Sequence, residues 1–112
     1  MNEARKTVAV AVITANRCAM LDACLQSLLR SDYPADELIV LDNASTDDTP
    51  SMLASKYPQV RHVRMESNKG LTFCHNTAMR LFRSDCLFLL DDDNEVAPDM
   101  LGKLVNYLHA PG

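Results

Sequence analysis

Four apolar segments along the chain have the length and composition of β-strands. Residues 7–13 (TVAVAVI) and 37–42 (ELIVLD) are rich in aliphatic and β-branched side chains, which indicates buried strands. Residues 60–65 (VRHVRM) alternate apolar and polar positions, which favours a strand nearer an edge of a sheet. Residues 86–90 (CLFLL) are apolar without interruption, so we expect this strand in the centre of the sheet.

The segments between these strands have the apolar spacing of helices. Over residues 19–30 the apolar positions fall on one helical face, and the same pattern returns over residues 71–82. A short helix is predicted from Pro50 to about Tyr57, because proline fits a first helical turn. A last helix opens at Pro98. Each predicted strand is thus followed by a helix.

This alternation predicts an α/β fold, with a Rossmann-like, three-layer α/β/α architecture and a mainly parallel sheet. If the strand order is 3-2-1-4, the order reverses between the first and fourth strands, and ligands bind beyond the carboxyl ends of strands at such a point. Polar residues follow three of the strands at this end: Asn16 and Arg17, then Asp42 and Asn43, then Asp91, Asp92 and Asp93. We expect these groups to meet in one crevice.

Composition limits the classes of function. The chain has 112 residues, 47% of them hydrophobic, which suits one domain over residues 1–112. Its net charge is −4, and without a basic stripe we expect no nucleic-acid partner. No apolar run approaches the roughly 18 residues of a membrane span, and the first residues lack a signal-peptide layout. The four cysteines form no CxxC pair and indicate reduced, packed thiols, with a zinc site or a disulfide as the alternatives. We therefore expect a cytoplasmic protein, either free or peripheral to the membrane.

The three consecutive aspartates are the strongest chemical signal. Along an extended chain, Asp91 and Asp93 point to one side and Asp92 to the other. Oxygen ligands suit Mg²⁺ or Mn²⁺, and Mg²⁺ is usually held by one or two carboxylates together with substrate phosphates. The pattern therefore predicts a divalent metal at Asp91 and Asp93 that arrives with a phosphate-bearing ligand. The alternative is a solvated turn after a strand.

Other polar residues have a structural and a functional interpretation. Asp42 is either a residue that ends a strand and makes a turn, or a carboxylate that accepts N–H groups of a ligand such as the imide of uracil. Residues 43–47 favour a helix cap over a ligand contact. Lys69 and Gly70 either cap the third helix or bind phosphate at its N-terminus. His75 is more simply structural than catalytic.

Several familiar motifs do not occur in the sequence. Neither GxGxxG nor GxxxxGK[ST] is present, so there is no dinucleotide fingerprint and no P-loop. GxSxG is also missing, so nothing indicates an acyl-transfer nucleophile. The phosphates of a ligand would then be held by the metal, which favours nucleotide-sugar chemistry over redox or ATPase chemistry.

The motifs in combination resemble the N-terminal half of family 2 glycosyltransferases, which have the GT-A fold. The likeness extends over about residues 8–104 and rests on the "ITANR" strand end, the "DNASTD" block, the "NKG" turn and the "DDD" run. It implies a nucleotide-sugar donor, with UDP-sugars as the default class, and transfer to a glycan, lipid or protein acceptor. A nucleotidyltransferase is a weaker rival, because "TANRCAML" is not a glycine-rich loop.

The resemblance also implies roles for individual residues. Thr14, Ala15 and Asn16 would lie against the nucleotide, Asp42 would contact the base, and the aspartates would contact ribose and metal, with Asp93 as the usual ligand. Together with the residues above, the predicted nucleotide-sugar site is Thr14, Ala15, Asn16, Asp42, Asn43, Lys69, Gly70, Asn76, Asp91 and Asp92. The predicted metal ligands are Asp91 and Asp93.

The sequence departs from the common family pattern at three positions and in length. "ITANR" replaces a Pro-Thr-Tyr-Asn-like run, "DNAS" replaces Asp-Asp-Gly-Ser, and His75 stands where an arginine is common. The chain also ends where the family's acceptor-binding half would follow, so we expect this half to be missing. Two further hypotheses follow: a non-catalytic nucleotide-binding module, or a fold fragment that is inactive without a C-terminal half. An uncovered sheet edge would favour association of copies.

Overall fold

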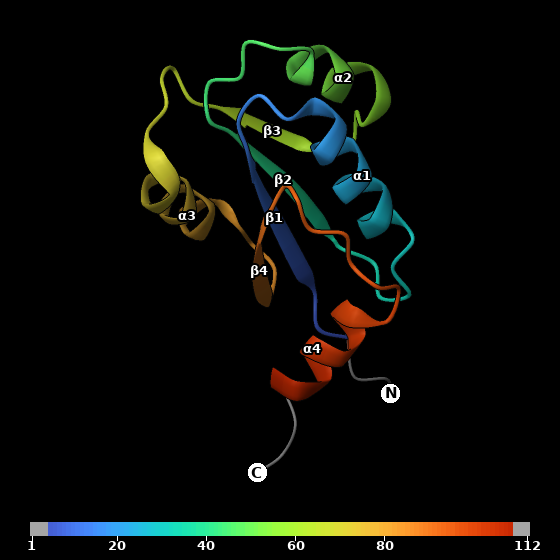
Figure 1. The fold of residues 1–112 in the computed structure, drawn as a ribbon. Coiled ribbons are helices and arrows are strands. Elements are labelled where there is room, and N and C mark those ends of the chain that lie inside the picture. The colour runs from blue at the N-terminus through green and yellow to red at the C-terminus, as the bar shows by residue number, and fades with distance from the viewer. Residues whose placement is uncertain (1–4, 109–112) are drawn as a thin grey trace.

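The computed structural model describes residues 5–108, which form an alternating series of strands and helices (Figure 1). The strands are β1 (Val8–Thr14), β2 (Glu37–Asp42), β3 (Arg61–Arg64) and β4 (Cys86–Asp91). The helices are α1 (Cys18–Leu29), α2 (Thr49–Lys56), α3 (Gly70–Leu81) and α4 (Met100–Leu108). The predicted alternation is confirmed, and the predicted bounds differ from the observed ones by two residues at most.

The strands form one parallel sheet in the order β3-β2-β1-β4, as predicted. The register pairs Thr14 with Asp42 across β1 and β2, and Ile13 with Asp91 across β1 and β4. These pairs lie at the carboxyl ends of their strands. The polar residues that follow the three strands are therefore brought to one edge of the sheet.

Helices cover both faces of the sheet and give the predicted three layers (Figure 1). One core lies between the sheet and the helices α1, α2 and α4, and the side chains of Leu21, Leu25, Leu53 and Leu101 are buried in it. The second core is smaller and packs α3 against the other face through Cys74 and Ala78. All seven residues of β1 are buried, as the β-branched composition of this strand predicts.

The prediction that residues 86–90 form a central strand is wrong. β4 pairs with β1 and has no further strand beyond it within residues 5–108, so it lies at an edge of the sheet. Its side chains are less covered than those of β1, and Leu89 is 37% exposed. The apolar composition of residues 86–90 favours burial, but the described residues leave β4 only partly covered. By contrast, β3 lies at the other edge, as its alternation predicts.

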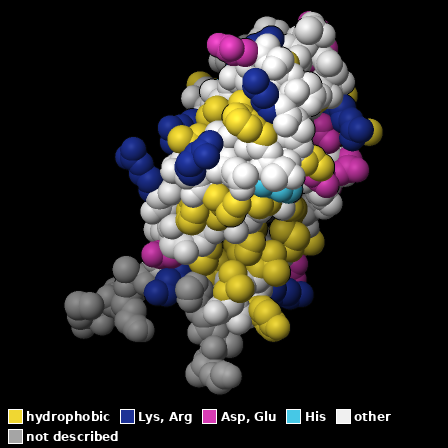
Figure 2. Space-filling model, turned by 90° about the vertical axis from the view of Figure 1, so that its left-hand side faces the viewer, with side chains coloured by type: hydrophobic (Ala, Val, Ile, Leu, Met, Phe, Trp, Pro, Cys, Tyr) yellow, Lys and Arg dark blue, Asp and Glu magenta, His cyan; other side chains and the backbone are white. Residues whose placement is uncertain are grey.

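Hydrophobic side chains gather on the surface that carries α3, β4 and α4 (Figure 2). The exposed large side chains of these elements are Leu71, Phe73, Met79, Leu89, Leu104, Tyr107 and Leu108. Within residues 5–108, no helix has both the length and the apolar composition that a membrane span requires.

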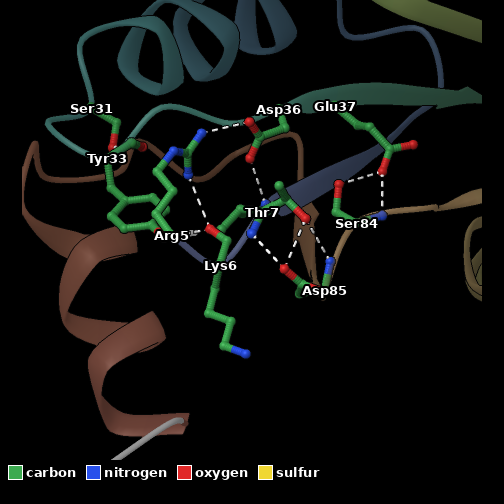
Figure 3. Close-up of polar contacts among 10 residues, drawn as sticks. Arg5, Lys6, Thr7, Ser31, Tyr33, Asp36, Glu37, Ser84 and Asp85 are labelled. Carbon is green, nitrogen blue, oxygen red and sulfur yellow. Dashed lines mark hydrogen bonds and ion pairs between the residues drawn. The ribbon is translucent and has the colours of Figure 1, made fainter. Parts of the chain in front are cut away.

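Carboxylates join the amino ends of β1, β2 and β4 (Figure 3). Asp36 accepts the backbone N–H of Val8 at 2.8 Å, and Glu37 accepts the backbone N–H of Ser84 at 2.8 Å. Thr7 and Asp85 exchange side-chain and backbone hydrogen bonds of 2.9 Å. These contacts set the register at the amino ends of the strands, and so help to align the opposite, carboxyl ends.

Candidate functional site

A pocket of about 300 Å³ opens at the carboxyl ends of the strands. It is lined by Ile13, Thr14, Ala15, Arg17, Asn43, Leu71, Asp91, Asp92 and Asp93. The structure thus brings together these residues of the predicted site: Thr14, Ala15, Asn43, Asp91, Asp92 and Asp93. The remaining predicted residues lie outside this lining: Asn16, Asp42, Lys69, Gly70 and Asn76.

Asp91 and Asp93 are exposed in the pocket, whereas Asp92 between them is buried. β4 ends at Asp91, and the next residues form a turn in which the backbone N–H of Asn94 donates to the Asp91 carbonyl at 3.2 Å. The two side chains therefore face the pocket although the strand stops short of Asp93. Within residues 5–108, neither exposed carboxylate has a hydrogen-bond or ion-pair partner.

The exposed carboxylates can be tested as metal ligands. Residues 5–108 contain no group of three or more His, Cys, Asp or Glu side chains that could hold a metal ion. A divalent ion such as Mg²⁺ is commonly bound by only one or two carboxylates, with water and substrate phosphate completing its coordination. Asp91 and Asp93 fit this pattern because their oxygens are exposed and have no partner. They fit a metal that binds together with a phosphate group.

Asp92 connects two strand ends. It is 5% exposed, and its Oδ2 accepts a hydrogen bond of 2.9 Å from Oγ1 of Thr14, the last residue of β1. Its Oδ1 lies 3.4 Å from the Arg17 guanidinium. Burial, followed by the negative charges of Asp92, Glu95 and Asp93, raises the pKa of the nearby Cys24 thiol to about 12. Asp92 thus positions the turn that carries the two exposed carboxylates.

Asp42 is fully buried and already has partners. Its Oδ1 accepts the backbone N–H of Ser45 at 2.8 Å, and its Oδ2 lies 2.8 Å from Nε2 of His62. A nitrogen of Arg64 is 3.6 Å from the same oxygen. In this arrangement the carboxylate organises the loop after β2, and its predicted contact with a base stays a prediction.

Asn16 adopts a left-handed backbone conformation with φ 56°. Asparagine tolerates this region better than most residues. Its Oδ1 accepts the backbone N–H of Thr46 at 2.7 Å and that of Asp47 at 3.2 Å. Asp47 in turn accepts the backbone N–H of Cys18 at 3.1 Å and that of Thr49 at 3.0 Å, at the starts of α1 and α2. The loops after β1 and β2 are therefore held together, and the predicted capping role of residues 43–47 rests on Asp47.

Asn43 joins β2 to the start of α3. Its Oδ1 accepts the backbone N–H of Lys69 at 2.8 Å, and its Nδ2 donates to Oδ1 of Asn68 at 2.8 Å. The same Asn68 oxygen accepts the backbone N–H of Gly70 at 3.0 Å. Gly70 has φ 82°, and an added Cβ would meet no atom within 4 Å, so glycine here serves a left-handed turn. The backbone N–H groups of the N-cap residue Lys69 and of Gly70, the first residue of α3, are thus bonded to side chains.

An arginine and a histidine near the site were not among the predicted ligands. Arg17 lines the pocket, and His62 contacts Asp42. The register of the parallel strands β2 and β3 pairs Asp42 with Arg64, and His62 lies two residues before Arg64 on the same face of β3. The alternation of β3 is therefore the sequence signal that could have identified His62. His75 is half-buried and Asn76 is exposed, and neither lines the pocket.

Comparisons with known proteins give the family. A sequence profile described as "Glycosyl transferase family 2" matches residues 9–112. The beta-monoglucosyldiacylglycerol synthase of Synechocystis sp. (strain ATCC 27184 / PCC 6803 / Kazusa) is 31% identical over an alignment of 111 residues, and the alignment covers 93% of this chain and 23% of that protein.

Solved structures share the fold. The mannosyltransferase PcManGT from Pyrobaculum calidifontis, in complex with GDP-Man and Mn²⁺, is 32% identical with a TM-score of 0.85 over 96% of this chain. TarS 1-349 of S. aureus, in complex with UDP-GlcNAc, is 22% identical with a TM-score of 0.81 over 91% of this chain. The chain covers 34% and 31% of those two structures, so it spans about a third of their length. The parallel sheet and its strand order are those of the GT-A fold, and the chain belongs to glycosyl transferase family 2.

Proposed function

We propose that the pocket binds a nucleoside diphosphate sugar together with a divalent metal, as the donor site of a glycosyltransferase. The observation that carries this proposal is the state of the three aspartates. Asp91 and Asp93 are exposed in the pocket without partners, while Asp92 is buried and held by Thr14. A buried carboxylate that fixes the turn would hold the two exposed carboxylates in place in the pocket, which suits a metal site.

The described residues would have different roles in the proposed site. Asp91 and Asp93 would hold the metal, which when bound supplies positive charge to the leaving diphosphate. Asp92 fixes the turn that carries them, through Thr14. Ala15 and Asn43 form the wall on the side of β1 and β2, where a nucleotide would lie.

Two lines of argument concern the base of the donor, and they favour different bases. The resemblance in sequence favours uracil. The solved structure with 32% identity holds GDP-Man, and the one with UDP-GlcNAc is less similar. A test of the donor site should therefore include both nucleotides, and uracil stays a prediction.

Sugar transfer by the whole protein is a separate proposal. The chain spans about a third of the similar structures, so transfer to an acceptor, whether glycan, lipid or protein, is proposed for the whole protein and not for these residues alone. The alternative is a module that binds the donor and does not catalyse transfer. Metal-dependent hydrolysis or transfer of a donor sugar by the 112-residue chain would decide against that alternative.

The experiment is a calorimetric titration of the chain with UDP, GDP and dTDP, each with and without Mn²⁺. We expect Mn²⁺-dependent binding of one nucleotide and its loss in Asp93→Asn. The matched control is Asp32→Asn, which removes the same charge from an exposed position in the loop before β2, away from the pocket. Failure of all three nucleotides to bind, or equal binding by both variants, would contradict the proposed site.

A further inference from the structure

Arg17 is the only cationic side chain among the described residues that line the pocket. It occupies the N-cap position of α1, directly after the loop that follows β1. Its side chain is 54% exposed, so its guanidinium is accessible to a ligand. The other charged groups in the lining are the three aspartates. A diphosphate entering this pocket would meet their negative charge, and cations must offset that repulsion.

The bond between Arg17 and Asp92 is weak enough to be exchanged. Its length is 3.4 Å, whereas charge-assisted N–H···O bonds are typically about 2.7–2.9 Å. Asp92 also accepts the Thr14 hydroxyl at 2.9 Å, so it would still have a partner without the arginine. A guanidinium carries five N–H donors, and within residues 5–108 this bond to Asp92 is the one that Arg17 makes. The remaining donors are available to phosphate oxygens.

The groups first predicted to bind phosphate are otherwise engaged. The backbone N–H groups of Lys69 and Gly70 are bonded to Asn43 and Asn68. The Lys69 ammonium lies 6.0 Å from the centre of the Phe73 ring, on α3. Neither Lys69 nor His75 lines the pocket. Arg17 is the cation that the described residues place there.

We propose that Arg17 binds the diphosphate of the donor, by moving its guanidinium from Asp92 to phosphate oxygens. The inference rests on the proposed donor site and adds a protein cation to the charge supplied by the metal. Arginine suits this role because its planar fork of donors matches phosphate oxygens in pairs. The same contact would persist on the leaving diphosphate, so Arg17 would also favour its departure.

The test compares ligands that differ only in phosphate. The affinities of the nucleoside, the nucleoside monophosphate and the nucleoside diphosphate are measured with Mn²⁺ by calorimetry, using the base that the wild-type chain binds. Arg17→Gln should weaken diphosphate binding about tenfold to a hundredfold, weaken monophosphate binding less, and leave nucleoside binding unchanged. Arg17→Lys should recover part of the loss, because it restores the charge without the paired geometry.

Two controls distinguish a ligand contact from a structural role. Arg30→Gln removes the same charge from an exposed position at the other end of α1 and should leave all three affinities unchanged. Thr14→Val removes the other partner of Asp92, so it reports what loosening Asp92 does to binding.

The outcomes separate this inference from the proposed function. Equal losses for nucleoside and diphosphate in Arg17→Gln, matching those of Thr14→Val, would mean that Arg17 acts only through Asp92 and would overturn the inference. Unchanged diphosphate affinity would overturn it as well. In both cases Mn²⁺-dependent binding by the wild-type chain would leave the donor site standing, whereas the absence of that binding would count against the site itself.

Discussion

The hydroxyl of Thr14 donates a 2.9 Å hydrogen bond to the buried carboxylate of Asp92, a residue 78 positions away in the sequence. This bond joins the end of β1 to the turn after β4, although the two segments have three further strands and three helices between them along the chain. The bond holds the carboxylate of Asp92, which is 5% exposed, in a buried position between the exposed carboxylates of Asp91 and Asp93. The geometry of the candidate metal ligands therefore depends on a residue of another strand.

Replacing Thr14 with valine should lower the free energy of unfolding by about 2 kcal/mol, because a buried carboxylate loses its shorter hydrogen bond while the side-chain volume is kept. Urea denaturation followed by circular dichroism measures this difference. Thr72→Val, at an exposed position of α3, is the control and should change the free energy by less than about 0.5 kcal/mol. Equal effects of the two substitutions would contradict the structural role of the Thr14–Asp92 bond.

Asp22 gives the fold a dependence on acid pH. Its carboxylate accepts a hydrogen bond of 2.7 Å from Lys56 and one from the Tyr57 hydroxyl, and these contacts lower its pKa in the folded chain. A lowered pKa stabilises the fold above the unfolded value of about 3.9, and the contribution is lost as the pH falls through the folded pKa. Asp22→Asn should therefore be less stable than the wild type at pH 7 by about 1 kcal/mol, since Lys56 is partly exposed.

Urea denaturation at pH 7, 5 and 3 tests this dependence. The difference between Asp22→Asn and the wild type should be nearly constant from pH 7 to 5 and should narrow at pH 3. Asp32→Asn, at an exposed position, serves as the charge-matched control. A difference that stays constant down to pH 3 would show that the carboxylate charge of Asp22 contributes nothing.

The four cysteines should differ in reactivity. Cys24, Cys74 and Cys86 are buried, and Cys18 at the start of α1 is half-buried. Burial raises the pKa of the Cys24 thiol to about 12, which removes the reactive thiolate at neutral pH. At pH 8, a chromogenic disulfide should modify one thiol per chain first, and Cys18→Ser should remove this phase whereas Cys24→Ser should not. Two or more fast thiols would contradict the burial of the other three.

The sequence predicted the fold well because its signal is local and repeated. The β-branched run of β1 and the helical spacing of α1 each report burial without reference to distant residues. The chain order of strands and helices then permits few sheets, and the observed order is the predicted one. An uninterrupted apolar run, unlike the alternation of β3, does not reveal whether a strand lies at the centre or the edge of the sheet. β4 has the composition of a covered strand, yet no described strand lies beyond it.

The candidate site was predictable in position but only partly in its contacts. The order of polar residues at strand ends locates the crevice. Asp92 is buried between two exposed aspartates, but β4 ends at Asp91, so a turn and not the alternation of an extended strand places these side chains. The partners of Asp42 depend on the register of β3 against β2, which no local pattern specifies. Arg17 was visible as a polar residue after β1, but its place in the pocket lining depends on how the chain turns after Asn16.

The edge strand β4 leads to a prediction about association. Within residues 5–108, the side chain of Leu89 on β4 is 37% exposed next to a sheet edge. On α4, the side chains of Leu104, Tyr107 and Leu108 are exposed as well. Sheet edges that carry apolar side chains pair readily with other chains, and charged side chains there prevent it. The 112-residue chain should therefore associate with itself as its concentration rises, and Leu89→Lys should keep it monomeric. Sedimentation velocity at a series of concentrations measures both, with Met20→Lys on α1 as the control for adding a charge at an exposed apolar position. A wild-type chain that stays monomeric, or association that Leu89→Lys does not reduce, would mean that this edge is not where copies meet.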